Sequence, residues 1–384
     1  MMPNSVNKLL KKQHYEIVGN HSAVQICRWT KKSLRCEGVC YKEKFYGIKS
    51  HLCCQMTPSL WCPNQCVHCW RAIEFTTGNK IPGKIDSPKD IIDGCIKAQK
   101  KLLQGFKIDS KSEKKQLSKA NQKKYKEAQE PIHFAISLSG EPTLYKNIGD
   151  LIQELRQRGK TTFLVTNGLY PEKLKELQEK NQLPTQLYVS VNTPNKKLYD
   201  KFHRSLEKNA WEKLNQTLDI LKSLNTRTVF RINLIKSLNM DEKCVKEFAK
   251  LIKKTSGEAK PLTASSKSRH KPMFVELKGF MSVGFARKRL GYDRMPWHED
   301  VLDFAKDFKH DKEFEFIKVD LDKKLKDLRD ELLKKLKGKF NGMEVACSIA
   351  SGDGKQHMAL ISALINLPIG IRFAALTKEG VIDL

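Results

Sequence analysis

The sequence predicts an α/β protein built on a parallel sheet or barrel. Between residues 132 and 277, short apolar and branched segments with the length of buried strands alternate with segments of helical spacing. The expected strands are 132–138, 161–166, 187–191, 228–234 and 274–277, and the expected helices include 91–103, 148–158 and 211–224. In such folds the functional groups lie on the loops that follow the carboxyl ends of the strands.

Composition narrows the class of protein. The chain has 384 residues, 71 Lys and Arg against 43 Asp and Glu, a net charge of +28, and 40% hydrophobic residues. This apolar content excludes a disordered acidic chain, and the excess of positive charge favours a polyanionic partner, with nucleic acid first and an anionic membrane surface second. Because no apolar run is long enough to span a membrane and no signal-peptide pattern opens the sequence, we expect a cytoplasmic protein.

Two segments depart from the alternating pattern. Residues 107–130 are rich in Lys, Ser, Gln and Asn, which predicts a solvated insert. A stripe of leucines predicts an amphipathic helix within 318–342: Leu321, Leu325, Leu328, Leu332 and Leu336. We therefore divide the chain into an N-terminal extension (1–54), an α/β region that contains the insert (55–317), the helix (318–342) and a partial C-terminal module (343–384).

Three cysteines form the sharpest motif. Cys62, Cys66 and Cys69 have the spacing CxxxCxxC, and thiols in a reducing compartment are better metal ligands than disulfide partners. Structural zinc prefers four ligands, whereas a [4Fe–4S] cluster held by three thiolates keeps one iron open. The spacing is the signature of radical S-adenosylmethionine (SAM) enzymes, which cleave SAM to a 5′-deoxyadenosyl radical. The alternative is a zinc knuckle with His68 as its fourth ligand.

Further cysteines stand upstream of this motif. Cys27, Cys40 and Cys53 are evenly spaced and could hold a second three-thiolate cluster, for which Cys36 and Cys54 compete as ligands. The remaining cysteines lie on helical or apolar stretches and are expected to be buried hydrophobic residues: Cys95, Cys244 and Cys347.

Polar residues follow the expected strands, where residues of a cofactor pocket would lie. The candidates are Ser139, Gly140 and Glu141 after the first strand, Thr166 and Asn167 after the second, and Ser190 and Asn192 after the third. Arg231 and Asn233 alternate with apolar residues, so they share one face of their strand and are expected to point into the barrel. The alternative for Arg231 is an ion pair with a neighbouring carboxylate.

Several stretches together carry a family resemblance: 28–34, 40–51, 55–58, 62–71, 275–281 and 291–300. They resemble the archaeal tRNA 4-demethylwyosine synthases, which are radical SAM enzymes of the wyosine pathway, and the resemblance covers about residues 20–316. It implies a partial TIM-type (β/α)6 radical SAM barrel with an N-terminal cysteine-rich extension. The C-terminal appendage is atypical, because the family usually closes with a short strand.

The resemblance also implies cofactors and their ligands. Two [4Fe–4S] clusters are expected, with Cys62, Cys66 and Cys69 on the cluster that binds SAM and with Cys27, Cys40 and Cys53 on the other. The loop at 139–141 resembles the family's Gly-Gly-Glu element, whose backbone and acid hold the methionine ammonium of SAM.

The implied substrates are SAM, pyruvate and tRNA-Phe that carries N1-methylguanosine on the 3′ side of the anticodon. In the family's mechanism the deoxyadenosyl radical abstracts hydrogen from the N-methyl group, and the methylene radical adds to the carbonyl carbon of pyruvate. Carbon–carbon cleavage and ring closure then give the tricyclic base. The position of Lys42 is proposed to form a Schiff base with pyruvate, and the alternative is pyruvate chelated by the second cluster.

The expected partners follow from this reading. Because no flavodoxin-like domain precedes the barrel, we expect a separate ferredoxin or flavodoxin to supply the electron, and we expect a monomer. The insert at 107–130 would be either a loop close to the tRNA or solvated padding. Two rival functions stay open: a radical SAM enzyme with another RNA or small-molecule substrate, and a non-enzymatic zinc-binding RNA protein that uses His68 or His51 as ligands.

Overall fold

The computed structural model describes residues 4–107, 120–256, 273–307, 324–337, 344–347, 354–366, 370–377 and 380–383. The chain divides into two compact units. The first consists of Met1–Val39 with Lys49–His310, and the second consists of Cys40–Ile48 with Asp311–Leu384.

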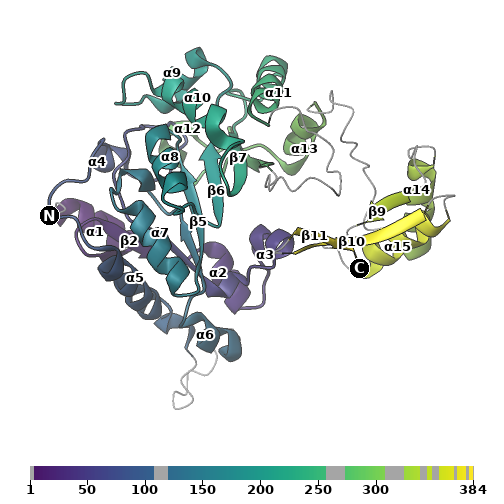
Figure 1. The fold of residues 1–384 in the computed structure, drawn as a ribbon, viewed down its shortest axis with the longest axis horizontal. Coiled ribbons are helices and arrows are strands. Elements are labelled where there is room, and N and C mark those ends of the chain that lie inside the picture. The colour runs from purple at the N-terminus through teal and green to yellow at the C-terminus, as the bar shows by residue number, and fades with distance from the viewer. Residues whose placement is uncertain are drawn as a thin grey trace. The chain divides into compact units, whose positions relative to one another are not determined.

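The first unit is built on one eight-stranded sheet whose strands follow the order of the sequence, from β1 to β8. Figure 1 shows the central strands of this sheet side by side. The first two strands, β1 (Glu16–Val18) and β2 (Ser22–Gln25), are antiparallel to their neighbours, and the next six are parallel. Those six are β3 (Cys53–Thr57), β4 (His133–Ile136), β5 (Thr161–Thr166), β6 (Gln186–Ser190), β7 (Arg227–Leu234) and β8 (Met273–Gly279). Six parallel strands in sequence order confirm the predicted α/β fold and are consistent with a partial barrel.

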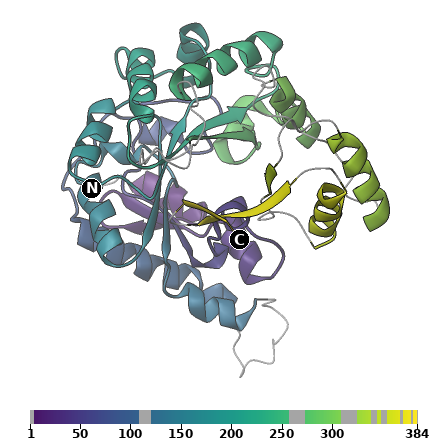
Figure 2. The same ribbon diagram turned by 45° about the vertical axis from the view of Figure 1, so that its right-hand side comes forward.

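Helices connect the parallel strands and surround the outer face of the sheet (Figure 2). They are α5 (Pro88–Leu102), α7 (Ile148–Gln157), α8 (Pro171–Glu179), α9 (Lys196–His203), α10 (Ala210–Leu221) and α11 (Glu242–Ser256). Helix α5 begins where Ser87 accepts a hydrogen bond from the backbone N–H of Asp90, with Pro88 at its first position. No helix in the described ranges has the length and apolar character needed to cross a membrane.

Shorter helices complete the first unit: α1 (Asn4–Lys12), α2 (Arg28–Leu34), α4 (Ile73–Thr76), α6 (Gln122–Ala128), α12 (Gly284–Leu290) and α13 (His298–Asp307). Three 3-10 turns lie between them: η1 (Ser50–Leu52), η2 (Gln104–Phe106) and η3 (Pro142–Leu144).

Alternation along the strands separates two faces of the sheet. Cys54 and Met56 of β3 are fully buried in the core between the sheet and helices α5 and α7. Since successive side chains in a strand point to opposite faces, Cys53 and Gln55 lie on the other face, toward the barrel interior. Both are only partly buried.

Two predicted boundaries differ from the structure. Residues 1–54 are not a separate extension, because β1, β2 and β3 are strands of the barrel sheet itself. The segment 107–130, predicted as a solvated insert, contains helix α6, whose Tyr125 and Ala128 are buried in a cluster with Leu34. Because α6 is rich in lysine, its composition did not indicate this apolar face. Residues 108–119 of the predicted insert lie outside the described residues.

The second unit contains α3 (Tyr41–Tyr46), α14 (Leu325–Leu336), α15 (Gly354–Ile365) and a three-stranded sheet. Strand β9 (Glu344–Cys347) is parallel to β10 (Gly370–Thr377), which pairs in antiparallel fashion with β11 (Gly380–Asp383). The predicted leucine stripe buries Leu328, Leu332 and Leu336, and α14 packs against α15. Leu321 of the stripe lies outside the described residues.

Candidate active site

The CxxxCxxC motif lies on a loop that follows β3, at the carboxyl edge of the parallel strands. Cys62 is fixed by its backbone, because its N–H donates to the carbonyl of Thr76 (3.1 Å) and its carbonyl accepts from the N–H of Gly78 (3.0 Å). The side-chain amide of Asn167, which follows β5, lies 3.8 Å from the Cys62 sulfur. The structure therefore brings the predicted cysteine loop and a predicted pocket residue together.

The end of helix α9 supports the other side of this loop. The N–H of Gln65 donates to the carbonyl of His203 (2.8 Å), and the N–H of Val67 donates to the carbonyl of Phe202 (3.0 Å). Arg204 adds two hydrogen bonds from its guanidinium to the carbonyl of Gln65. Sequence reasoning missed these supports, since nothing in the spacing of 202–204 sets it apart from any other helix end.

Arg71 places a buried positive charge beside the three cysteines. Arg71 is 4% exposed, and its guanidinium donates to the hydroxyl of Thr76 (2.6 Å) and the carbonyl of Asn64 (2.7 Å). Burial alone would lower the pKa of Arg71, but the neighbouring thiols of Cys62, Cys69 and Cys66 raise this pKa overall. Arg71 stands two positions after Cys69, and that position was its only signal in the sequence.

Burial acts on the thiols of Cys62 and Cys66. Burial raises the pKa of Cys62 to about 11 and raises the pKa of Cys66 well above its usual value. No three His, Cys, Asp or Glu side chains within the described ranges could hold a single metal ion. A [4Fe–4S] cluster instead takes each thiolate on a different iron, and three mutually interacting thiols beside a buried cation fit such an anionic group.

The loop after β4 packs directly on the segment that leads into the cysteines. Gly140 has a φ of +69°, and a Cβ atom at this position would lie 1.9 Å from the carbonyl oxygen of Ser59. The N–H of Glu141 donates to the carbonyl of Trp61 (2.7 Å), and the hydroxyl of Thr57 donates to the carbonyl of Ser139 (2.6 Å). Only glycine fits this close backbone approach.

The carboxylate of Glu141 is buried and already accepts four hydrogen bonds. Its Oε1 accepts from the N–H (3.1 Å) and hydroxyl (2.6 Å) of Thr143 and from the hydroxyl of Thr166 (2.7 Å), and its Oε2 accepts from the N–H of Asn167 (2.7 Å). Burial raises the pKa of this carboxyl, and the hydrogen bonds oppose that rise. Through these hydrogen bonds Glu141 ties the loops after β4 and β5 together.

The loop after β6 is held in place by hydrogen bonds between three asparagines. The side-chain oxygen of Asn192 accepts from the N–H of Asn233 (3.0 Å), and Asn192 is 4% exposed. Asn239, which sequence reasoning missed, donates from its side chain to the carbonyls of Asn192 (2.8 Å) and Asn233 (2.9 Å). Ser190 ends β6 and is half-buried.

Arg231 forms an ion pair with a carboxylate, which was the alternative prediction for this residue. It lies opposite Glu276 of β8 in the register, and its Nε and Nη2 donate to the two carboxylate oxygens of Glu276 (2.7 and 3.2 Å). Its guanidinium also stacks over the ring of Tyr188, 5.1 Å from the centroid. Alternation with buried Ile232 puts this ion pair on the inner face of the sheet, as expected.

The second set of predicted cysteine ligands falls on both units. Cys27 precedes α2 and Cys53 opens β3 in the first unit, whereas Cys40 precedes α3 in the second unit, and all three are half-buried. Of the two competitors, Cys54 is buried in the core and Cys36 is exposed with a φ of +58°. Lys42 is half-buried on α3.

A segment late in the chain reaches the same cysteine loop. The N–H of Phe285 donates to the carbonyl of Trp70 (3.1 Å), and a Cβ on Gly284 would lie 2.5 Å from that carbonyl oxygen. Arg289, also on α12, donates to the carbonyls of Val67, Cys69 and Arg71 and pairs with Glu74 (3.2 Å). Helix α12 is therefore part of the site.

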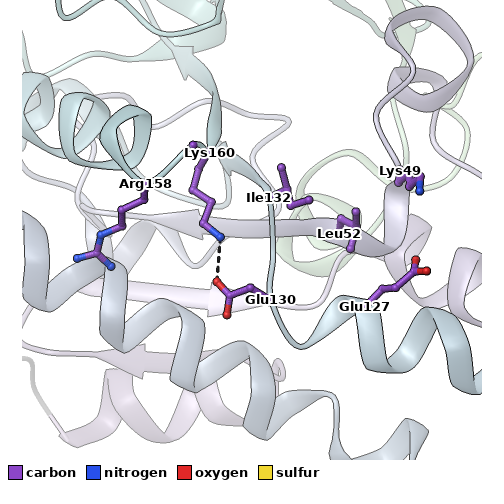
Figure 3. Close-up of a pocket in the computed structure, with 8 residues that line it drawn as sticks. Lys49, Leu52, Glu127, Glu130, Ile132, Arg158 and Lys160 are labelled. Atoms are coloured by element: carbon purple, nitrogen blue, oxygen red, sulfur yellow. Dashed lines mark hydrogen bonds and ion pairs between the residues drawn. The ribbon is translucent and has the colours of Figure 1, made fainter.

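A surface depression lies at the opposite end of the strands (Figure 3). It is lined by residues that precede β4 and β5, among them Ile132 and Lys160, and Lys160 pairs with Glu130 (2.8 Å). Active sites of parallel barrels form at the carboxyl edge, so this depression is not the candidate site.

Comparison with known proteins decides the family. A family model described as the radical SAM superfamily matches residues 56–251, and one described as wyosine base formation matches residues 269–321. The chain is 46% identical over 305 residues to the S-adenosyl-L-methionine-dependent tRNA 4-demethylwyosine synthase of Pyrococcus abyssi, which covers 79% of this chain and 82% of that protein. The chain belongs to the tRNA 4-demethylwyosine synthase family. The family member of Methanocaldococcus jannaschii is 34% identical over 336 residues, which cover 86% of this chain and 97% of that protein.

Solved structures agree with this assignment. The structure of TYW1 with a lysine–pyruvate adduct bound has a TM-score of 0.67 and 33% identity, and archaeal TYW1 has a TM-score of 0.61 and 31% identity. Each comparison covers 83% of this chain and 93% of the other chain. As a tRNA 4-demethylwyosine synthase family member, the chain is a radical SAM enzyme of the wyosine pathway. The segments of the chain that match the two family models contact each other at the cysteine loop. The first segment contains Cys62–Cys69, and the second contains α12.

Proposed function

We propose that this chain converts N1-methylguanosine in tRNA-Phe to 4-demethylwyosine, with pyruvate as the source of carbon and SAM as the radical source. The observation that carries the proposal is the docking of the wyosine-formation segment on the radical SAM cysteine loop, through Phe285 and Arg289. A segment specific to this base would then lie directly beside the radical source.

The three cysteines of the motif would hold a [4Fe–4S] cluster, which with SAM supplies the 5′-deoxyadenosyl radical. Arg71 would balance the negative charge of the three thiolates. Asn167, whose amide lies beside Cys62, and the loop Ser139–Gly140 would line the space for SAM, while Glu141 would hold these loops in place.

A second [4Fe–4S] cluster would use Cys27, Cys40 and Cys53. The choice of Cys53 over its neighbour is supported by strand alternation, which buries Cys54 in the core and turns Cys53 to the barrel interior. The choice against Cys36 is supported by its exposure.

Lys42 would hold pyruvate as a Schiff base: its neutral amine attacks the keto carbon, and the carbonyl oxygen leaves as water. The support is a solved relative described with a lysine–pyruvate adduct, together with the position of Lys42 two residues from Cys40. The alternative, pyruvate chelated by the second cluster, predicts that Lys42→Arg retains turnover.

The tRNA would bind along α12 and the segment that follows it. Arg287 and Tyr292 form an exposed cation–aromatic pair, with the guanidinium 4.7 Å from the ring centroid, and Trp297 is 74% exposed. Exposed aromatic rings beside positive charges suit unstacked bases and phosphates of a single-stranded loop. We also propose a cytoplasmic monomer that receives its electron from a separate ferredoxin or flavodoxin.

The test is anaerobic purification followed by iron and sulfide analysis and turnover with N1-methylguanosine-containing tRNA-Phe, pyruvate, SAM and a reductant. The expected result is about eight irons per chain and 4-demethylwyosine among the digested nucleosides by mass spectrometry. SAM cleavage without this product would favour another substrate. Bound zinc without iron would favour the non-enzymatic RNA-binding reading.

A further inference from the structure

His203, at the end of α9, faces the sulfur of the central cysteine of the motif. Its Nδ1 lies 3.1 Å from the Sγ of Cys66, and the residue is 3% exposed. The ring also packs against two aromatic rings, because its centroid lies 4.5 Å from that of Tyr199 and 5.2 Å from that of Phe202.

The backbone makes this contact a fixed one. The residues on either side of Cys66 are hydrogen-bonded to 202–203, by Gln65 N–H to the carbonyl of His203 and by Val67 N–H to the carbonyl of Phe202. These two backbone hydrogen bonds hold Cys66 next to His203, as the backbone hydrogen bonds of paired strands hold facing residues together. A side chain positioned this firmly can orient a hydrogen bond.

The direction of the hydrogen bond follows from the chemistry of the sulfur. A cysteine that ligates iron is a thiolate, which only accepts, so the proton must come from the imidazole and Nδ1 must carry it. A neutral imidazole then has a lone pair on Nε2. Within the described part of the chain, Nε2 is buried and has no hydrogen-bond partner. No acceptor there would therefore stabilise the other tautomer, in which Nε2 carries the proton.

We infer that His203 donates an Nδ1–H···S hydrogen bond to the Cys66 thiolate and makes the SAM-binding cluster easier to reduce. A donor to a cluster sulfur withdraws electron density and stabilises the reduced state, which carries one more negative charge. His203 is a positioning residue that acts through Cys66. The inference rests on the proposed function, in which Cys66 is a cluster ligand.

The test compares three anaerobic holoenzyme variants by potentiometric EPR titration of the signal that changes when SAM is added. His203→Leu removes the donor, and we expect a more negative midpoint potential. His203→Asn presents an amide N–H in place of Nδ1 and should restore the potential toward that of the wild type. Lys201→Arg is the matched control, because Lys201 is exposed on the same helix and the substitution keeps its charge, so the potential of this variant should stay unchanged.

An unchanged potential in a fully loaded His203→Leu variant would overturn the inference. If that variant loses its cluster, pulsed EPR of the protein labelled with 15N-histidine decides instead. A 15N coupling to the SAM-sensitive signal that disappears in His203→Asn supports the hydrogen bond, and the absence of any such coupling excludes it. A wild-type protein without a SAM-sensitive signal would contradict the proposed function and not this step alone.

Discussion

The guanidinium of Arg289 donates a hydrogen bond to the backbone carbonyl of Cys69, across 220 residues of sequence. The same side chain reaches the carbonyls of Val67 (3.3 Å) and Arg71 (3.2 Å). Loop carbonyls that face one guanidinium are held in one arrangement, because the planar fork of donors fixes their relative directions. The wyosine-formation segment thus helps to shape the loop that would bind the SAM cluster.

Replacing Arg289 with Lys should loosen this loop while keeping the charge. A hydrogen bond to a charged donor contributes about 1.5–3 kcal/mol, so we expect the variant to lose iron on the order of tenfold faster. Iron retention against a chelator, followed by absorbance under anaerobic conditions, measures this. Lys288→Gln is the control, since Lys288 is exposed on the same helix and its amine lies over the ring of Phe285 (5.4 Å). Equal rates of iron loss in the two variants would contradict the role of Arg289.

Gly140→Ala should be far more damaging than Gly159→Ala, although both glycines have a φ near +70°. Both substitutions carry the backbone strain, which costs about 1–2 kcal/mol. At Gly159 a Cβ meets nothing within 4 Å, whereas at Gly140 it would lie 1.9 Å from the carbonyl oxygen of Ser59. We expect Gly140→Ala to lose on the order of 4 kcal/mol or to fail to fold. Thermal unfolding compares the two, and similar midpoints would show that the Ser59 contact yields easily.

The parallel core of this fold could be predicted because its signals are local. The strand 161–166 has the predicted bounds, and the other four expected strands overlap β4, β6, β7 and β8. The cysteine motif could also be recognised from the sequence, because it lies within eight consecutive residues. Helix α6 was missed because its buried face, with Tyr125, is small among many lysines.

The supports of the site could not be predicted because they come from distant segments. His203, Arg204 and Arg289 contact the cysteine loop only through the folded chain. The hydrogen bonds of Glu141 could not be predicted for a related reason. A sequence shows that an acid follows a strand, but only the structure shows which four groups donate to its carboxylate.

In the metal-free protein, Cys62 should react with iodoacetamide much more slowly than Cys36. The thiolate is the reactive form, and with a pKa of about 11 for Cys62 only about one molecule in a thousand is a thiolate at pH 8. A raised pKa means that reactivity grows as the pH rises, so the rate should increase about tenfold from pH 8 to pH 9. Alkylation rates by mass spectrometry test this. Equal rates for buried Cys62 and exposed Cys36 at pH 8 would show that the loop opens without its cluster.

Tyr292 and Arg287 should contribute to tRNA binding in different ways. Tyr292→Ala removes a stacking surface and should weaken binding by about 1–3 kcal/mol, with little change in salt dependence. Arg287→Gln removes a phosphate contact and should lower the slope of log Kd against log salt concentration by about 1. Lys97→Gln on α5 is the control, because Lys97 is exposed and lines a shallow surface depression with Asp93 and Lys100 on the same helix. Fluorescence anisotropy with labelled tRNA at several salt concentrations measures both effects. If all three variants bind as tightly as the wild type while iron content is unchanged, the tRNA contacts a surface other than α12 and the segment that follows it.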